Sequence, residues 1–517
     1  YAPLLRQCSK QRSLHSGRRL HAQILRHRLD RHTLLCNLLV QMYGRCGCLD
    51  EARSIFDKTP ERNLFSWSIM IAAYAQNGHP TFALAVYREM LQRSIHAIDS
   101  TTYVSALSAC SALGDLETGK SIHERILSSK LEIDAFLGTA LISMYSKCGC
   151  LEEAHECFDC VLRKDIVVWN AMIAAFAQNG HPQRALNFFH AIPRGELQPN
   201  NLTLVSALDA CSDLAALEEG RKIHALIESS PELTLGGSMG NALVNLYGKC
   251  GRAIDARAVF DALRPRTVVS WTSMIAAYAQ NGHSDQALEL FQRMDMAPNG
   301  VTLLSVLQAC SEHRKGSHAG KTIHAHIRLA GFDGSPLLDS ALVNMYGKVG
   351  NLDSAMVVFT QMRERDAITW TAMISSYAQH GHSRQALSLF SSMLLDGIAT
   401  DAVTLACVSS ACSHSGDVKL GWDYFVSSVR DFGERPTFEH YVVMSDMLSR
   451  AGRLQEAEDL LRSMPFQPDL VSWRTLLSAC SNHNNPHVGK RVADRILELS
   501  PSDPAALVLL SNIYSAA

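Results

Sequence analysis

Apolar and polar residues recur along the chain with the period of an amphipathic α-helix, and short polar turns interrupt the pattern. The segment 271–294 shows one complete unit. Spacings of i, i+3, i+4 and i+7 predict a first helix whose apolar face carries Trp271, Met274, Ile275 and Tyr278. Asn281-Gly282 then breaks this helix, and Ser284 is expected to cap a second one. The apolar stripe of the second predicted helix is Ala287, Leu288, Phe291 and Met294.

The two-helix unit is repeated along the whole chain. Tryptophans separated by 102, 102, 99 and 103 residues mark the period, at Trp67, Trp169, Trp271, Trp370 and Trp473. Histidines mark the same period, at His21, His123, His224 and His324. Packing between repeats, or a role on the surface, would explain these histidines. Two short helices cannot bury their apolar faces alone, whereas stacked neighbours can. The sequence therefore predicts an all-α solenoid of repeated antiparallel helix pairs.

Longer phrases repeat around the tryptophans. They read SWSIMIAAYAQNGH (66–79), VWNAMIAAFAQNGH (168–181), SWTSMIAAYAQNGH (270–283) and TWTAMISSYAQHGH (369–382). Together with GKSIH and ALVNMYGK, these phrases resemble the pentatricopeptide repeat (PPR) family in its plant PLS subclass, where P-, L- and S-type repeats alternate. The resemblance covers the whole chain and implies a right-handed superhelix similar to that of tetratricopeptide repeats.

The resemblance also sets motif boundaries, once the residue after each tryptophan is taken as the fifth of its motif. The repeat array is expected to span 1–437. S-type motifs are expected at 33–63, 135–165, 237–267 and 336–366. P-type motifs are expected at 64–99, 166–200, 268–299 and 367–401. L-type motifs are expected at 100–134, 201–236, 300–335 and 402–437, after a truncated one at 1–32. A final S-type motif (438–469), an E-type motif (470–504) and a truncated second E-type motif (505–517) are expected to complete a chain that is part of a longer protein.

The residue after the tryptophan changes from copy to copy while its surroundings do not. Small polar side chains placed once per repeat can donate or accept hydrogen bonds, so a strand of extruded bases is a natural partner. The resemblance implies that the fifth residue of a motif and its last residue, here called a reading pair, together select one base. The implied pairs are Asn37 with Asn63 (C), Ser68 with Asp99 (G), Thr139 with Asp165 (G), Asn170 with Asn200 (C), Asn241 with Thr267 (a pyrimidine), Thr272 with Asn299 (A), Ser340 with Asp366 (G) and Thr371 with Asp401 (G).

The L-type motifs have no such pair. Their fifth residues lack side-chain donors and acceptors; these residues are Val104, Val205, Leu304 and Ala406. The implied single-stranded RNA is 5′-C-G-N-G-C-N-Y-A-N-G-G-3′. Two assignments depend on irregular motifs. The motif 64–99 is one residue longer than its counterparts, which leaves Ile98 as an alternative to Asp99, and the motif 268–299 is short near its end, so its neighbour places Asn299.

Two further sets of residues recur with the motifs. The second residue of the reading motifs is mostly apolar, and in the family such residues wedge between bases. Inter-repeat core is an equally good explanation here. The apolar second residues are Leu34, Phe65, Phe136, Val167, Val269, Leu337 and Ile368. S-type motifs carry a cation near the end of the first helix. Such a cation could contact a phosphate of the RNA, or it could simply complement the helix dipole. These cations are Arg45, Lys147, Lys249, Lys348 and Arg450.

Composition narrows the classes of function. A net charge of −2 argues against the bulk electrostatic attraction by which basic proteins hold nucleic acid. The best metal-site candidate is Cys148, Cys150, Cys157 and Cys160 with His155, but several of these recur at repeat-equivalent positions, so neither a metal site nor a cofactor is expected. The zinc-deaminase patterns H-x-E and P-C-x-x-C are absent from the sequence, so the chain is not expected to be an enzyme.

By resemblance, these features indicate a sequence-specific RNA-binding protein of mitochondria or plastids, similar to specificity factors for C-to-U RNA editing. Such a protein would be monomeric, would have no membrane segment, and would recruit a DYW-type deaminase or an editing cofactor protein through 470–517. One alternative is a protein-binding α-solenoid scaffold. Another is a fragment of a longer editing enzyme whose deaminase domain lies outside this sequence.

Overall fold

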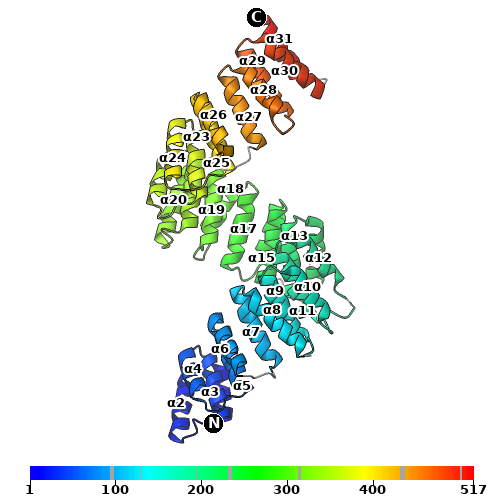
Figure 1. Ribbon diagram of the computed structural model, residues 1–517, viewed down its shortest axis with the longest axis vertical. Coiled ribbons are helices and arrows are strands. Elements are labelled where there is room, and N and C mark those ends of the chain that lie inside the picture. The colour runs from blue at the N-terminus through cyan, green and yellow to red at the C-terminus, as the bar shows by residue number, and fades with distance from the viewer. Residues whose placement is uncertain are drawn as a thin grey trace. The chain divides into compact units, whose positions relative to one another are not determined.

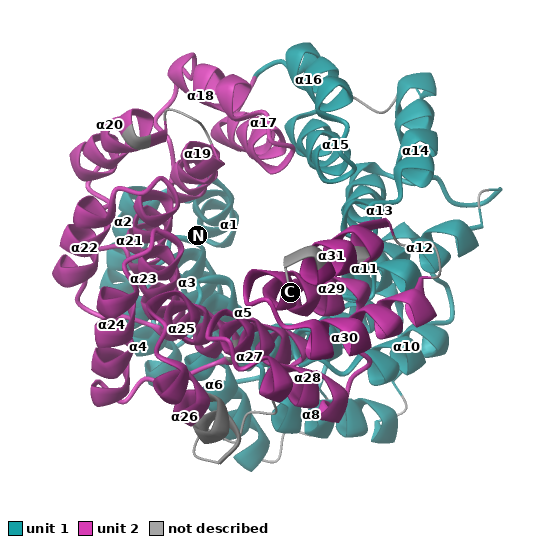
Figure 2. Cartoon of the chain, turned by 90° about the horizontal axis from the view of Figure 1, so that it is seen from above, with its two compact units in different colours: residues 1–265 teal, residues 266–517 magenta. Residues whose placement is uncertain are grey.

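A computed structural model describes residues 1–93, 98–129, 131–193, 195–230, 236–312, 316–430, 437–500 and 504–516. Within these residues the secondary structure is helical and contains no strand, which confirms the predicted all-α class. The chain forms two compact units, Tyr1–Pro265 and Arg266–Ala517 (Figure 2). Each unit is a stack of antiparallel helix pairs, so the predicted α-solenoid of helix pairs is confirmed as well (Figure 1).

The odd-numbered helices are the first helices of the pairs, and the even-numbered helices are the second. First helices of the first unit are α1 (Ala2–Gln11), α3 (Thr33–Arg45), α5 (Leu64–Gln76), α7 (Ser100–Leu113), α9 (Ala135–Lys147), α11 (Ile166–Gln178), α13 (Asn201–Asp213) and α15 (Gly237–Lys249). Its second helices are α2 (Leu14–Arg26), α4 (Leu49–Lys58), α6 (Pro80–Gln92), α8 (Leu116–Ser128), α10 (Leu151–Cys160), α12 (Pro182–Ala191), α14 (Leu217–Ser229) and α16 (Ala253–Ala262).

The second unit continues the same alternation. Its first helices are α17 (Val268–Gln280), α19 (Gly300–Glu312), α21 (Pro336–Lys348), α23 (Ala367–Gln379), α25 (Ala402–Ser415), α27 (Phe438–Arg450), α29 (Leu470–Asn482) and α31 (Pro504–Ala516). Its second helices are α18 (Ser284–Gln292), α20 (Gly316–Leu329), α22 (Leu352–Gln361), α24 (Ser383–Leu395), α26 (Val418–Arg430), α28 (Leu454–Ser463) and α30 (Pro486–Leu499). From α3 to α29, each first helix begins at the residue where an expected motif begins; the P, L and S classes themselves remain an expectation.

Within each unit the first helices pack against one another in one layer, and each also packs against its own second helix. The second helices form the other layer, which Figure 2 shows outside the first helices in each unit. Tryptophans hold successive pairs together: Trp67 is fully buried, and its ring lies edge-on to Phe56 of α4 with centroids 5.0 Å apart. Trp370 packs in the same way on Phe359 of α22, at 4.7 Å. Such aromatic burial supplies much of the stability of a repeat interface.

The Asn-Gly pairs end the first helices as expected. At the end of α5, the Asn77 side chain donates hydrogen bonds to the carbonyl oxygens of Ala73 (2.7 Å) and of Gly44 on α3 (2.8 Å). Gly78 follows with a φ of 78°, a left-handed conformation that glycine adopts without strain. The expectation that Ser284 caps the next helix is wrong. His283 occupies the N-cap of α18, and Ser284 is its first helical residue, because the glycine turn already directs the chain into the helix.

The repeated histidines link four second helices, α2, α8, α14 and α20, to the first helices that follow them. Each histidine Nδ1 lies within hydrogen-bonding distance of a tyrosine hydroxyl, in the pairs His21–Tyr43 (3.0 Å), His123–Tyr145 (2.9 Å), His224–Tyr247 (2.9 Å) and His324–Tyr346 (3.1 Å). Repeat packing, one of the two expected explanations, therefore accounts for these histidines.

These pairs make folding stability depend on pH. Burial lowers the pKa of His21, His123 and His324 below the ordinary value of 6.5. The unfolded chain therefore binds protons more readily than the folded one, and the free energy of unfolding should fall as the pH drops below 6.5. Urea unfolding at about pH 7.5 and about pH 5.5 measures this loss. A variant with these three histidines changed to Gln should lose less stability over the same interval; an unchanged loss would contradict the assignment.

Candidate nucleic-acid interface

The fifth residue of each motif lies just beyond the first turn of a first helix. Four of these side chains are buried, with 3–8% of their surface exposed; they are Asn37, Ser68, Asn170 and Thr272. The other four are partly exposed; they are Thr139, Asn241, Ser340 and Thr371. The fifth residues are therefore accessible only to a group that reaches in between neighbouring helices.

The last residue of each motif is the N-cap of the first helix that follows. In each case the side chain accepts a hydrogen bond from a backbone N–H in the first turn; these residues are Asn63, Asp99, Asp165, Asn200, Thr267, Asn299, Asp366 and Asp401. N-caps of this kind stabilise a helix by about 1 kcal/mol, so these polar residues have a structural role. The cap uses one side-chain oxygen. Each Asn keeps its amide nitrogen, and each Asp keeps its second oxygen, for a further hydrogen bond.

Both irregular motifs have a clear register in the structure. Asp99 caps α7, whereas the alternative residue Ile98 is buried with 8% of its surface exposed. Asn299 caps α19 by accepting a hydrogen bond from the Thr302 backbone N–H at 2.9 Å. Asp99 and Asn299, rather than their neighbours, are therefore equivalent to the last residues of the other motifs.

The structure brings some reading pairs into direct contact. The Asn37 amide donates to Asn63 Oδ1 at 3.3 Å, and the Asn170 amide donates to Asn200 Oδ1 at 3.1 Å. Asn241 lies on α15 in the first unit, and Thr267 caps α17 in the second unit. Four pairs with a hydroxyl as fifth residue, those of Ser68, Thr272, Ser340 and Thr371, are connected differently, through a third residue.

That third residue, which the sequence analysis missed, is a threonine three residues after the last residue of the motif. Its hydroxyl donates to the last residue and also lies within hydrogen-bonding distance of the fifth residue. At 367–401, for example, Thr404 Oγ1 lies 2.6 Å from Asp401 Oδ1 and 2.6 Å from Thr371 Oγ1. The five such threonines have no exposed surface; they are Thr102, Thr203, Thr302, Thr369 and Thr404. The phrases DSTT, NNLT, NGVT, DAIT and DAVT carried the signal, since a hydroxyl three residues after an N-cap is a capping-box pattern.

Hydrogen bonds from such a threonine favour the ionised form of the carboxyl. Burial by itself would raise the pKa of Asp99, but hydrogen bonds from Thr102 and Thr101 outweigh it, and the pKa is lowered. Asp99 thus stays an acceptor of hydrogen bonds at neutral pH.

The apolar second residues are on the surface. Exposed fractions run from 49% for Leu34 to 74% for Ile368, with Phe65, Phe136, Val167, Val269 and Leu337 between them. Inter-repeat core therefore does not explain these residues. The equivalent residues of three L-type motifs, Leu202, Val301 and Val403, are also exposed, which the sequence analysis did not anticipate.

The five cations of the S-type motifs are all exposed at the ends of first helices. Two of them have acidic partners: Lys249 Nζ lies 2.8 Å from Asp213 Oδ1, and Arg450 Nε lies 2.8 Å from Asp446 Oδ2. A phosphate would have to compete with these carboxylates, so the cations offer at most a weak electrostatic contribution.

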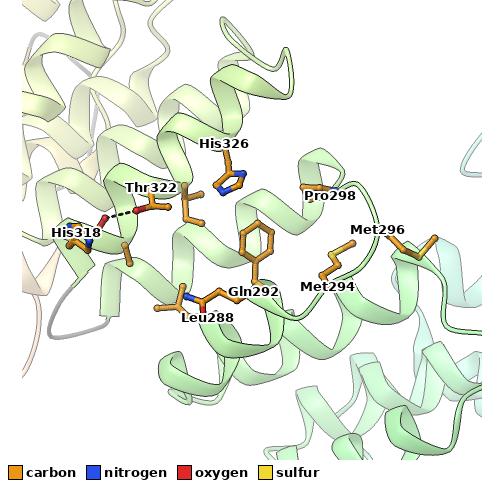
Figure 3. Close-up of a pocket in the computed structure, with 11 residues that line it drawn as sticks. Leu288, Gln292, Met294, Met296, Pro298, His318, Thr322 and His326 are labelled. Atoms are coloured by element: carbon orange, nitrogen blue, oxygen red, sulfur yellow. Dashed lines mark hydrogen bonds between the residues drawn. The ribbon is translucent and has the colours of Figure 1, made fainter.

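A cavity of about 920 Å³ lies on the second-helix side of the second unit, between α18 and α20 (Figure 3). It exists because α18 ends at Gln292, so that Met294, Met296 and Pro298 line the cavity from a loop. The predicted apolar stripe is therefore partly wrong: Met294 lies outside the helix, and Leu290 is a buried residue that the pattern missed. The lining of the cavity is largely apolar and includes none of the reading pairs.

The described residues present neither a metal-binding cluster nor a helix able to span a membrane. No group of three or more His, Cys, Asp and Glu side chains in that part of the chain is arranged to hold a metal ion. Of the cysteines in the candidate cluster, Cys157 is buried and its Sγ lies 4.0 Å from His123 Nε2. None of the helices in the described ranges combines the length and the apolar character needed to cross a membrane.

Stacked helix pairs with one polar pair per repeat place the chain among helical-repeat solenoid proteins. The PPR repeat family matches residues 164–213 and 365–414. The PPR repeat itself matches residues 35–64, 65–95, 139–166, 241–264, 269–297, 340–366 and 439–466. The chain belongs to the pentatricopeptide repeat family.

Relatives agree with this membership, and a solved structure shares the fold. A chloroplastic pentatricopeptide repeat-containing protein of Arabidopsis thaliana is 37% identical over 519 residues, which are 99% of this chain; the chain spans 64% of that protein's length. A mitochondrial one from the same plant is 34% identical, with 100% of this chain and 75% of that protein covered. The crystal structure of maize PPR10 in complex with an 18-nt psaJ RNA element shares the fold, with a TM-score of 0.64 at 17% identity over 100% of this chain and 81% of that chain.

Exposure of the second residues predicts their effect on stability. Phe136→Ser on α9 should change the free energy of unfolding by about 1 kcal/mol or less, because the ring is 56% exposed. The matched control Leu137→Ser alters the next residue, which has no exposed surface, and should lower the free energy of unfolding by roughly 3 kcal/mol or more. Urea unfolding of both variants measures the difference, and equal losses would show that Phe136 is a core residue.

Proposed function

We propose that the protein binds single-stranded RNA, with one base read by each P- or S-type motif. The observation that carries the proposal is the series of exposed apolar second residues, each three positions before a polar fifth residue on the same helix face. Stacking on apolar side chains favours any unpaired base, and hydrogen bonds to the base edge select among bases. A base held between the second residues of two successive motifs would turn its edge toward one reading pair.

The chemistry of the reading pairs fits this arrangement. Capping leaves one amide nitrogen or carboxylate oxygen of each exposed Asn or Asp available to a base. Three of the four expected L-type motifs keep an apolar second residue, but all four have apolar fifth residues, which are Val104, Val205, Leu304 and Ala406. Such motifs would hold a base without selecting it, and the proposed RNA is therefore C-G-N-G-C-N-Y-A-N-G-G.

Charge contributes little to this proposal, which distinguishes it from general binding to nucleic acid. The net charge is −2, and two of the five repeated cations have acidic partners. Few counterions would be released on binding, so affinity should depend on salt only weakly. Membership of the PPR family and the fold shared with RNA-bound maize PPR10 also support binding to RNA. The chloroplastic and mitochondrial relatives support a site of action in one of these organelles.

Gel-shift titration of the full chain tests the proposal. The chain should bind C-G-N-G-C-N-Y-A-N-G-G at least about tenfold more tightly than a scrambled RNA of the same composition, because each correct base contact discriminates by about 1–3 kcal/mol. A variant with Phe65, Phe136 and Leu337 changed to Ser should bind both RNAs more weakly, since it loses stacking and keeps the reading pairs. Equal wild-type affinity for the two RNAs would refute base reading, and binding of peptides instead of RNA would favour the protein-scaffold alternative.

The finer role that we propose is recognition of sites for C-to-U RNA editing. Residues 470–504 resemble an E-type motif, and the region presents exposed apolar side chains, among them Val471 on α29 and Leu507 on α31. These residues would contact a DYW-type deaminase or an editing cofactor protein supplied as a separate chain.

A reconstituted editing reaction tests this role. The chain, a separate DYW-type deaminase and an RNA with the binding element upstream of a cytidine should together yield uridine. Changing Val471 and Leu507 to Asp should reduce conversion by roughly tenfold without weakening RNA binding, because a buried charge disrupts an apolar contact. The control Ile254→Asp, at an 84% exposed residue of α16, should leave conversion unchanged. Equal conversion by all three proteins would argue against recruitment through 470–517.

A further inference from the structure

The buried threonine next to a reading pair is the feature of this interface that helix capping does not fully explain. In the motif 367–401, the backbone N–H of Thr404 already binds Asp401 Oδ1 at 2.8 Å, which satisfies the cap. The Thr404 hydroxyl adds a second bond to the same oxygen and also reaches Thr371 on the preceding first helix. A valine would fill the same space and leave the cap intact, so the hydroxyl is not needed for the cap.

We propose that Thr404 is a positioning residue that fixes the spacing and the hydrogen-bond polarity of its reading pair. Thr102, Thr302 and Thr369 bridge their pairs in a related way, but there the fifth residue also donates to a carbonyl oxygen of its own helix. The proposal rests on the proposed function of base reading. These threonines have no exposed surface, so they act through the two residues that they connect and not by touching RNA.

The direction of each hydrogen bond among Asp401, Thr404 and Thr371 follows from which of these side chains can donate. An ionised Asp401 can only accept, so the single Thr404 hydroxyl proton goes to Asp401 Oδ1. Thr404 Oγ1 must then accept from Thr371, which donates its own proton across the 2.6 Å contact. Thr371 keeps only lone pairs for an incoming base, and Asp401 offers its second oxygen. Two acceptors at a fixed separation suit a base edge with two adjacent N–H donors, and among the four RNA bases guanine alone has one.

The chain contains a natural comparison in the motif 135–165. Its reading pair, Thr139 with Asp165, has the same residue types as Thr371 with Asp401, but the third residue is Val168, which is fully buried. The Thr139 hydroxyl instead donates to the Ala135 carbonyl oxygen of its own helix at 2.7 Å. Asp165 Oδ1 accepts only backbone N–H groups, at 3.0 and 3.1 Å. Both pairs are expected to read guanine, but only one has its two members connected by a hydroxyl.

Single-base substitutions in the RNA measure this difference. The full chain is titrated with the element flanked by uridines, and with versions in which G becomes A at the fourth base (Thr139) or at the last base (Thr371). Wild-type preference for G over A should be greater at the last base. Thr404→Val should lower it there by roughly fivefold, the equivalent of about 1 kcal/mol for one hydrogen bond. Val168→Thr should raise it at the fourth base by a similar factor.

Controls separate this inference from the proposed function. Thr404→Ser keeps the hydroxyl and should preserve the preference, whereas a packing role would make Thr404→Ser, and not the isosteric Thr404→Val, the variant that loses it. Thermal unfolding of Thr404→Val checks that the repeat stays folded, and preferences at all other bases should not change. Asp401→Asn should move the preference at the last base toward A if reading pairs select bases at all. If Asp401→Asn does so and Thr404→Val has no effect, the threonine inference is wrong and base reading stands; if neither variant changes the preference, base reading itself is wrong.

Discussion

The hydrogen bond between an N-cap side chain and the first turn of the next first helix is the interaction on which the interface depends. A helix leaves backbone N–H groups without partners at its start, and the last residue of each motif supplies an acceptor for one of them. The bond fixes where each first helix begins, as at Asp99 before α7 and Asp401 before α25. It also places the cap residue beside the fifth residue of the same motif, on the first helix before it, so a single bond sets both the helix boundary and the position of a reading pair.

Next to each cap, neighbouring side chains of the first helix differ sharply in how much of their surface is exposed. On α9, Leu137 has no exposed surface while Phe136 beside it is 56% exposed. Buried residues of this kind join the helix to its neighbours, and exposed ones are free for a partner. Stacked repeats bury the same apolar stripe in every helix pair. The exposed residues on the opposite side of the first helices therefore form a repeated surface that can vary without loss of the fold. Ser68, Asn170 and Thr272, which differ within nearly constant phrases, are themselves buried, so exposure alone does not explain why they vary.

The proposed recognition therefore depends on many small contacts and little on charge. Lys249 is paired with Asp213, and Arg450 with Asp446, so part of the positive charge along the first helices is neutralised within the protein. Exposed apolar residues and single hydrogen bonds discriminate locally, so their effects should add between distant motifs. Buried threonines refine this picture, since a hydroxyl that never meets the partner can still determine which hydrogen bonds its neighbours offer.

The sequence by itself determined the architecture, because helical periodicity and the tryptophan period leave few ways to bury the apolar stripes. The resemblance supplied the motif boundaries, and helix starts such as Leu64 and Val268 coincide with them. The sequence named the reading pairs only through resemblance, and it left Phe65 and its equivalents divided between core and surface. Tertiary structure decided that question, since exposure depends on which neighbouring helix covers a residue. It also revealed the Thr404 bridge to Thr371, corrected the Ser284 cap, and showed that α18 ends before Met294. The exposure pattern and the Thr404 bridge arise from contacts between helices about thirty residues apart in the sequence, which a local pattern does not encode.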